Sequence, residues 1–134
     1  MTFKRLFLVS LILVMVTGCG GPYDASVKGV LLLDGSPVST GTVTFYPQGG
    51  GAPAYAQVQE DGSFVARTGD ANGLPSGNYE VSVRVVERIE AEKLGDPPRF
   101  KNLIPVRYKN PKTSGLAYEL SSGRNQIEVS LESE

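Results

Sequence analysis

The sequence contains 134 residues and no histidine, with 13 basic residues, 14 acidic residues and a formal net charge of −1. It therefore lacks the commonest general base and the commonest transition-metal ligand, and no basic cluster is present to neutralise nucleic-acid phosphates. These features argue against an enzyme, a metal site, a cofactor and nucleic-acid binding.

The N-terminus has the pattern of an export signal. Lys4 and Arg5 precede a run at 6–16 that is apolar except for Ser10. A lasting transmembrane helix needs roughly 20 apolar residues, so this shorter run has the length of a signal h-region. We therefore expect residues 1–18 to be a lipoprotein signal peptide that is removed and takes no part in the fold.

The next feature is the segment Val16-Thr17-Gly18-Cys19. It resembles the lipobox of bacterial lipoprotein signals, and the resemblance implies that Cys19 carries a lipid. Several acyl chains on one residue anchor a protein stably to a membrane. Residues 19–25 are then a lipidated tether, and the protein stays in the cell envelope on the outer or cytoplasmic membrane, facing the periplasm or the exterior. The alternative is an ordinary secretory signal that happens to contain a cysteine.

Removal of the signal leaves 116 residues, enough for one domain at residues 26–134. Two basic residues and no acidic residue are lost with the signal, so eleven basic residues face fourteen acidic ones and the formal charge is about −3. Cys19 is the only cysteine. The domain must therefore fold without an intramolecular disulfide.

Short alternating runs separated by Gly, Pro, Asn and Asp predict an all-β domain. Phe64 is the expected core anchor, and Tyr79, Val81 and Val83 are expected on the buried face of the strongest strand. Seven strands favour a Greek-key β-sandwich. The expected strands are 26–33, 41–46, 54–59, 63–67, 79–85, 116–120 and 126–131, with turns at 34–38 and 121–125 and an Asp-Gly hairpin at 60–62.

Turn and strand motifs follow one another along this domain. They are Val27-Lys28-Gly29-Val30, 33–38, 41–47, 61–64, 73–83, 104–108 and 113–116. Their order resembles the carboxypeptidase regulatory-like, or transthyretin-like, β-sandwich modules, in particular the small lipoproteins of that type in planctomycete bacteria. The resemblance implies a fold rather than a chemistry. One branch of that family hydrolyses a purine-derived ring with histidines, and this chain has none, so that activity is not implied.

The least regular segment is 86–112, which is rich in charge and proline. A connection of that length in a compact domain is often functional, and here it predicts a binding loop for an acidic or sugar-bearing partner. Residues 87–94 would form helical turns or extend the preceding strand outward. In the alternative, Ile104 and Tyr108 merely pin a long connection whose charges are solvated. The candidate binding residues are Arg99, Phe100, Lys101, Arg107, Tyr108 and Lys109.

Two weaker patterns would indicate a calcium site and a sugar-binding surface, and each also has a simpler explanation. Glu60, Asp61 and Asp70 offer carboxylates for calcium, but their spacing matches no known loop and Asp-Gly is explained by a turn. The tyrosines expected on exposed faces, Tyr46, Tyr55 and Tyr118, would stack on sugars or simply cover cross-strand neighbours. We expect no metal site.

Two functions are consistent with these patterns. The first is a non-catalytic, membrane-anchored module that binds another envelope component, either protein or polysaccharide, through its edge strands or the segment 86–112. The second is a small-ligand or carbohydrate-binding accessory to a separate enzyme, which requires a concave site with convergent polar groups. A deep pocket would favour the second function, whereas a flat charged face or an exposed apolar edge would favour the first.

Overall fold

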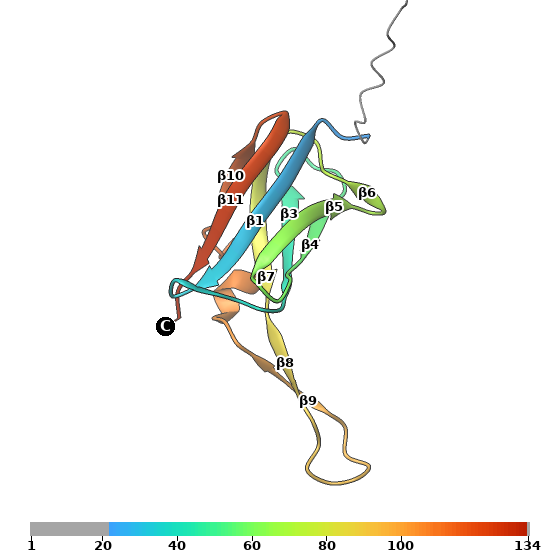
Figure 1. Cartoon of the computed structure of the whole chain (residues 1–134), viewed down its shortest axis with the longest axis vertical. Coiled ribbons are helices and arrows are strands. Elements are labelled where there is room, and N and C mark those ends of the chain that lie inside the picture. The colour runs from blue at the N-terminus through green and yellow to red at the C-terminus, as the bar shows by residue number, and fades with distance from the viewer. Residues whose placement is uncertain (1–21, 134) are drawn as a thin grey trace, which may run out of the picture.

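The computed structural model describes residues 22–133, and all of its regular structure except one 3-10 turn is β-strand (Figure 1). The all-β prediction is confirmed. The predicted signal peptide and Cys19 lie outside the described residues. Within residues 22–133, no helix has the length and apolar character that a membrane crossing needs.

Nine strands join in one sheet, and two more form a separate ribbon. The seven main strands of the sheet follow the order β10-β7-β3-β4-β5-β1-β11, while β2 pairs with β1 and β6 pairs with β5. The strands are β1 (Ala25–Leu33), β2 (Ser36–Pro37), β3 (Thr42–Pro47), β4 (Ala54–Gln57), β5 (Ser63–Thr68), β6 (Ala71–Asn72), β7 (Gly77–Arg84), β8 (Val86–Ile89), β9 (Arg99–Asn102), β10 (Ala117–Leu120) and β11 (Gly123–Leu131).

The sheet curls because β5 takes part in two different pairings. Its first residues pair with β1, at Gly29 and Phe64, and its later residues pair with β4, at Ala56 and Ala66. Strand β1 also pairs with β11 in parallel along its whole length, from Ala25 beside Gly123 onward. This parallel pair joins the two ends of the domain.

Local turn chemistry accounts for two of the hairpins. Asp34 and Gly35 both have positive φ, 50° and 82°, as a two-residue hairpin turn requires, so the turn predicted there is confirmed. At the second hairpin Gly62 has φ 87°, and the Asp61 carboxylate accepts bonds from the amide and hydroxyl of Ser63. The positive φ of Gly62 and the bonds to the Asp61 carboxylate therefore account for an Asp-Gly pair at this turn.

The core lies inside the curl and contains the residues that alternation placed there. Phe64 is 1% exposed, and its ring centroid lies 6.3 Å from that of Phe45, which also contacts Tyr79. The buried face of β7 is confirmed, because Tyr79, Val81 and Val83 are all buried. Burial of this aromatic and aliphatic cluster supplies the main favourable term in folding.

The structure corrects where the first and the last strand begin. Residues 24 and 25 were expected in the tether, but Asp24 is bonded to Ser76 and Ala25 is a buried residue of β1. The last strand begins at Gly123 rather than at residue 126, since its polar first residues pair with β1. Residues 123–125 are polar or glycine and show no alternation, and they belong to the strand because they pair in parallel with residues 25–27 of β1.

Tyr118 joins the two edges of the curled sheet. It pairs with the buried Tyr79, is half-buried against the core, and donates a hydrogen bond of 3.2 Å to the carbonyl of Glu128 on β11. Burial raises the pKa of Tyr118, and the nearby Glu128 carboxylate adds to the shift. The expectation that Tyr118 lies on an exposed face is wrong, because cross-strand partners share a face.

Candidate binding surface on a projecting arm

Residues 86–102 form an arm that projects from one end of the domain (Figure 1). Strands β8 and β9 pair antiparallel, and residues 90–98 connect them. All side chains of both strands are exposed. Two conformations were expected for residues 87–94. Residues 87–89 continue outward as a strand, so the extended conformation is correct for them.

The base of the arm is fixed to the domain. The amide of Leu103 donates a 3.0 Å hydrogen bond to the carbonyl of Val85, and Val85 is buried. Ile104 and Tyr108 are each 5% exposed within the core cluster. The part of the alternative interpretation in which these two residues pin the connection to the domain is confirmed by their burial.

The arm exposes an unusual share of large apolar side chains. Phe100 is 66% exposed, Ile89 is 43% exposed and Leu94, in the connecting loop, is fully exposed. Val86 at the base is also exposed. Ile89 lies opposite Arg99 and Phe100 lies opposite Arg88, so these two side chains project from opposite faces of the ribbon. The arm therefore exposes apolar side chains on both faces, which makes it a candidate contact surface.

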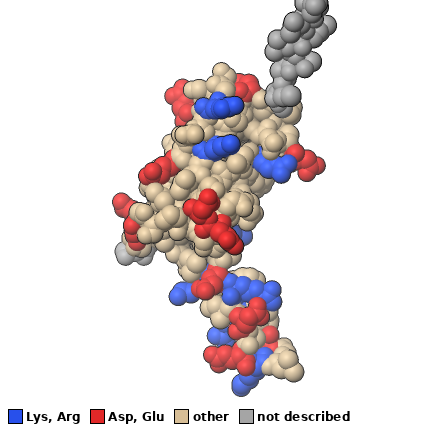
Figure 2. Space-filling model, viewed as in Figure 1, with Lys and Arg blue, Asp and Glu red and all other residues tan. Residues whose placement is uncertain are grey.

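Charges on the arm are balanced, and Figure 2 shows acidic and basic side chains interspersed along it. Residues 86–102 contain four acidic and four basic residues, and Arg88 forms an ion pair of 3.0 Å with Glu90. Such exposed pairs contribute little to stability. The arm as a whole therefore does not carry the net positive charge that an acidic partner would select.

The strand register divides the predicted binding residues of β9 between two faces. Phe100 lies opposite Arg88, whereas Lys101 lies opposite Glu87 and Arg99 lies opposite Ile89. Because side chains alternate along a strand, Phe100 projects from one face of the ribbon while Arg99 and Lys101 project from the other.

The other three predicted residues belong to the 3-10 turn η1 (Val106–Lys109). The Arg107 guanidinium lies 4.6 Å from the Tyr108 ring centroid and donates a 2.8 Å hydrogen bond to its hydroxyl. That hydroxyl in turn accepts a 3.0 Å bond from the Glu132 amide. Tyr108 is buried, so the prediction that it contacts a partner is wrong, and Arg107 serves mainly to hold it. Lys109 is half-buried, and neither ion pair found within residues 22–133 includes it.

Phe100 and Lys109 meet at the base of the arm. They line a hollow of about 460 Å³ together with Arg84, Val86 and Asn102. Arg84 and Asn102 were not predicted, although alternation from the buried Val83 would have placed Arg84 outside. The hollow combines two cations, an aromatic ring and an amide, which is a set of groups able to hold an anionic ligand.

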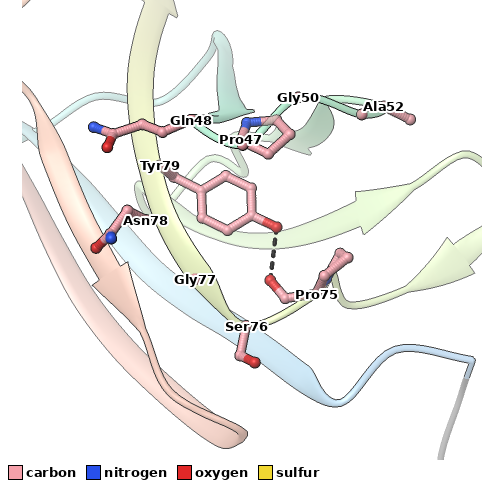
Figure 3. Close-up of a pocket in the computed structure, with 11 residues that line it drawn as sticks. Pro47, Gln48, Gly50, Ala52, Pro75, Ser76, Gly77, Asn78 and Tyr79 are labelled. Carbon is pink, nitrogen blue, oxygen red and sulfur yellow. Dashed lines mark hydrogen bonds between the residues drawn. The ribbon is translucent and has the colours of Figure 1, made fainter.

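A second hollow, of about 360 Å³, lies near the start of β7 (Figure 3). It is lined by residues 47–52, at the end of β3 and in the loop after it, and by residues 75–79, just before and at the start of β7, and no charged residue is among them. Tyr79 forms part of its wall and donates a 2.6 Å hydrogen bond to the Pro75 carbonyl. Burial raises the pKa of Tyr79, and the Asp24 carboxylate adds to the shift. We assign this hollow no chemistry.

Of the three carboxylates with a possible calcium role, that of Asp61 is bonded to Ser63. Hydrogen bonds from the Ser63 hydroxyl and amide lower the pKa of Asp61. Asp70 uses its backbone carbonyl to accept a bond from Arg67. Across residues 22–133, no three His, Cys, Asp or Glu side chains gather where they could hold a metal ion.

Two of the tyrosines considered for sugar stacking are on the outer face of the sheet. Tyr55 is 52% exposed on β4 and Tyr46 is 38% exposed on β3, while Thr44 is the partner directly opposite Tyr55. Tyr46 and Tyr55 are thus diagonal neighbours, as expected of residues that cover cross-strand neighbours.

Comparison with protein-family models, with curated proteins and with solved structures gives no match to this chain.

Proposed function

We propose that this protein is a lipid-anchored, non-catalytic module of the cell envelope whose arm binds another envelope component, protein or polysaccharide. The observation that carries the proposal is the exposure of Ile89, Leu94 and Phe100 on an element that projects from the domain. The exposed apolar edge favours this function over an accessory that supplies a small ligand to a separate enzyme.

The fold supports the proposal through the positions of the arm and the N-terminus. Asp24 is bonded to Ser76 just before β7 begins, and the arm starts where β7 ends. An eight-residue strand spans about 27 Å. Cys19, five residues before Asp24, is at most about 18 Å from it along the chain. A lipid on Cys19 would therefore hold the end of the domain opposite the arm (Figure 1).

We further propose that the main strands are a seven-stranded Greek-key sandwich of the carboxypeptidase regulatory-like type. The curl at β5 and the β1–β11 pair are consistent with that arrangement. The family assignment rests on the order of the sequence motifs described above. It adds no catalytic role to the chain.

Site-specific photo-crosslinking in cells tests the proposed contact. A photoreactive residue at Leu94 should give a reproducible adduct, since this side chain is fully exposed at the connecting loop of the arm. The matched control carries the same residue at Val65, which is 45% exposed on β5. An adduct at Leu94 alone supports the proposal. Equal adducts at both positions, or none at either, would contradict it.

A further inference from the structure

The hollow at the base of the arm is lined by two cations, Arg84 and Lys109. Arg84 ends β7 and Lys109 ends η1, and the ion pairs found within residues 22–133 involve neither of them. The nearby Arg88 and Lys112 are instead paired with Glu90 and Glu80. Arg84 and Lys109 therefore provide positive charge that the described part of the chain does not neutralise.

Both cations belong to elements that the core holds in place. Arg84 pairs with Thr42 of β3, next to the buried Val83 and Val85. Lys109 follows the buried Tyr108. Because their backbones are fixed, little ordering of the main chain is needed when a ligand binds, which lowers the entropic cost of binding.

The same hollow presents an aromatic ring and an amide. Phe100 is 66% exposed and projects from the face of the ribbon that also carries Arg88. The face of an aromatic ring is electron-rich and attracts the slightly positive carbon-bound hydrogens on one face of a sugar ring. Asn102 adds donors and an acceptor for hydroxyl groups.

We propose that this hollow binds a carboxylated sugar unit of an acidic polysaccharide. The sugar ring would stack on Phe100, its carboxylate would lie between Arg84 and Lys109, and Asn102 would bond to a hydroxyl. A highly charged polyanion such as nucleic acid is disfavoured because only two unpaired cations line the site. An apolar peptide is disfavoured because Val86 and Phe100 are the two apolar side chains among the five residues that line the hollow. The inference rests on the proposed function and specifies its partner.

Isothermal titration of the full chain in nonionic detergent tests the assignment. The probe is tetragalacturonic acid, compared with neutral maltotetraose and with a tetraglutamate peptide that has carboxylates but no rings. We expect binding of the uronate that weakens with salt, no binding of maltotetraose, and at least about tenfold weaker binding of the peptide. Absence of uronate binding, or equally tight binding of the peptide, overturns the assignment.

Matched variants locate the site. Arg84→Gln, Lys109→Gln and Phe100→Ala should each weaken uronate binding by about tenfold or more, because each removes a charged or stacking contact. Lys28→Gln and Tyr55→Ala remove an exposed cation and an exposed aromatic elsewhere, and they should leave binding unchanged. Thermal unfolding of each variant verifies folding. Equal effects of the site and control variants would place the ligand elsewhere and overturn the assignment.

The two proposals fail differently. If the Leu94 adduct forms but the uronate does not bind, the sugar assignment is wrong and the binding arm stands. If the uronate binds in the hollow and no adduct forms at Leu94, the sugar assignment stands and the contact at the end of the arm is wrong.

Discussion

Gly29 provides the sharpest test of the core packing. It lies in β1 opposite Phe64 of β5, and a Cβ atom at this position would lie 2.4 Å from Phe64 Cζ and 2.8 Å from the Ile127 carbonyl oxygen. The ring cannot move freely because Phe64 is 1% exposed and packs on Phe45. The carbonyl belongs to β11, which is paired with β1. Glycine is therefore required here to admit the Phe64 ring.

We expect Gly29→Ala to lower the free energy of unfolding by about 1–3 kcal/mol, the usual cost of overpacking a core. Urea denaturation of the full chain, followed by circular dichroism, measures the change. The control is Gly49→Ala, where no heavy atom lies within 4 Å of the added Cβ and a change below about 0.5 kcal/mol is expected. A loss below about 0.5 kcal/mol for Gly29→Ala would refute the packing.

A double-mutant cycle identifies the clash. Phe64→Leu shortens the side chain opposite Gly29, so Gly29→Ala should cost less in the Phe64→Leu background than in the natural protein. Part of the cost should remain because the Ile127 carbonyl stays in place. Additivity within about 0.5 kcal/mol would show that Phe64 is not the side chain for which Gly29 makes room.

Three further predictions concern the anchor, the arm and acid stability. Cys19→Ser should move the protein from the membrane fraction to a soluble or unprocessed form, and unchanged mass and membrane association would contradict lipidation. Replacing residues 86–102 by Asn-Gly should change the free energy of unfolding by less than about 1 kcal/mol, because the strand side chains that it removes are all exposed. A larger loss in urea denaturation would show that the arm supports the fold. Hydrogen bonds from the Ser76 hydroxyl and amide lower the pKa of Asp24, so this contact stabilises the fold above about pH 4 and is lost as the pH falls further. Asp24→Asn should therefore flatten the pH dependence of unfolding below that pH, as should Ser76→Ala to a lesser extent, and an unchanged dependence in Asp24→Asn would exclude the contact.

The sequence predicted the parts of the fold in which alternation and turn chemistry agree. The Asp34-Gly35 turn needs positive φ at both residues, which this pair tolerates, and the alternating valines after Tyr79 need one buried face. Both features are local, so they can be recognised without knowing which strands are neighbours. The Phe64 anchor follows from the same reasoning.

The arm was harder to predict because both of its faces are exposed to water. A ribbon with no buried side leaves no apolar period, so residues 86–102 resemble an irregular loop in the sequence. Its register, which separates Phe100 from Arg99 and Lys101, depends on pairing across a long connection. The position of Arg84 in the same hollow as Lys109 depends on the fold and is not encoded in any local motif.

The predicted exposure of two tyrosines, Tyr108 and Tyr118, was wrong. Tyr108 has a basic residue on either side and was predicted to contact a partner, yet its ring is buried and its hydroxyl is bonded to Arg107 and the Glu132 amide. The Glu132 amide lies 24 residues from Tyr108, so that contact depends on the tertiary fold. Tyr118 is two residues from Leu116 and from Leu120, so alternation itself places it on the apolar face that also carries the buried Tyr79.

Crosslinking of the natural protein and of an armless variant in cells tests the central claim most directly. The amide of Leu103 already bonds to the carbonyl of Val85, as in a β-turn, so Asn-Gly can replace residues 86–102 without moving the chain ends. Mass spectrometry of the crosslinked anchored protein should then identify a reproducible envelope protein or glycan for the natural chain, and the variant should lose it. The same partner at the same yield on the armless variant would show that the arm is not the binding surface.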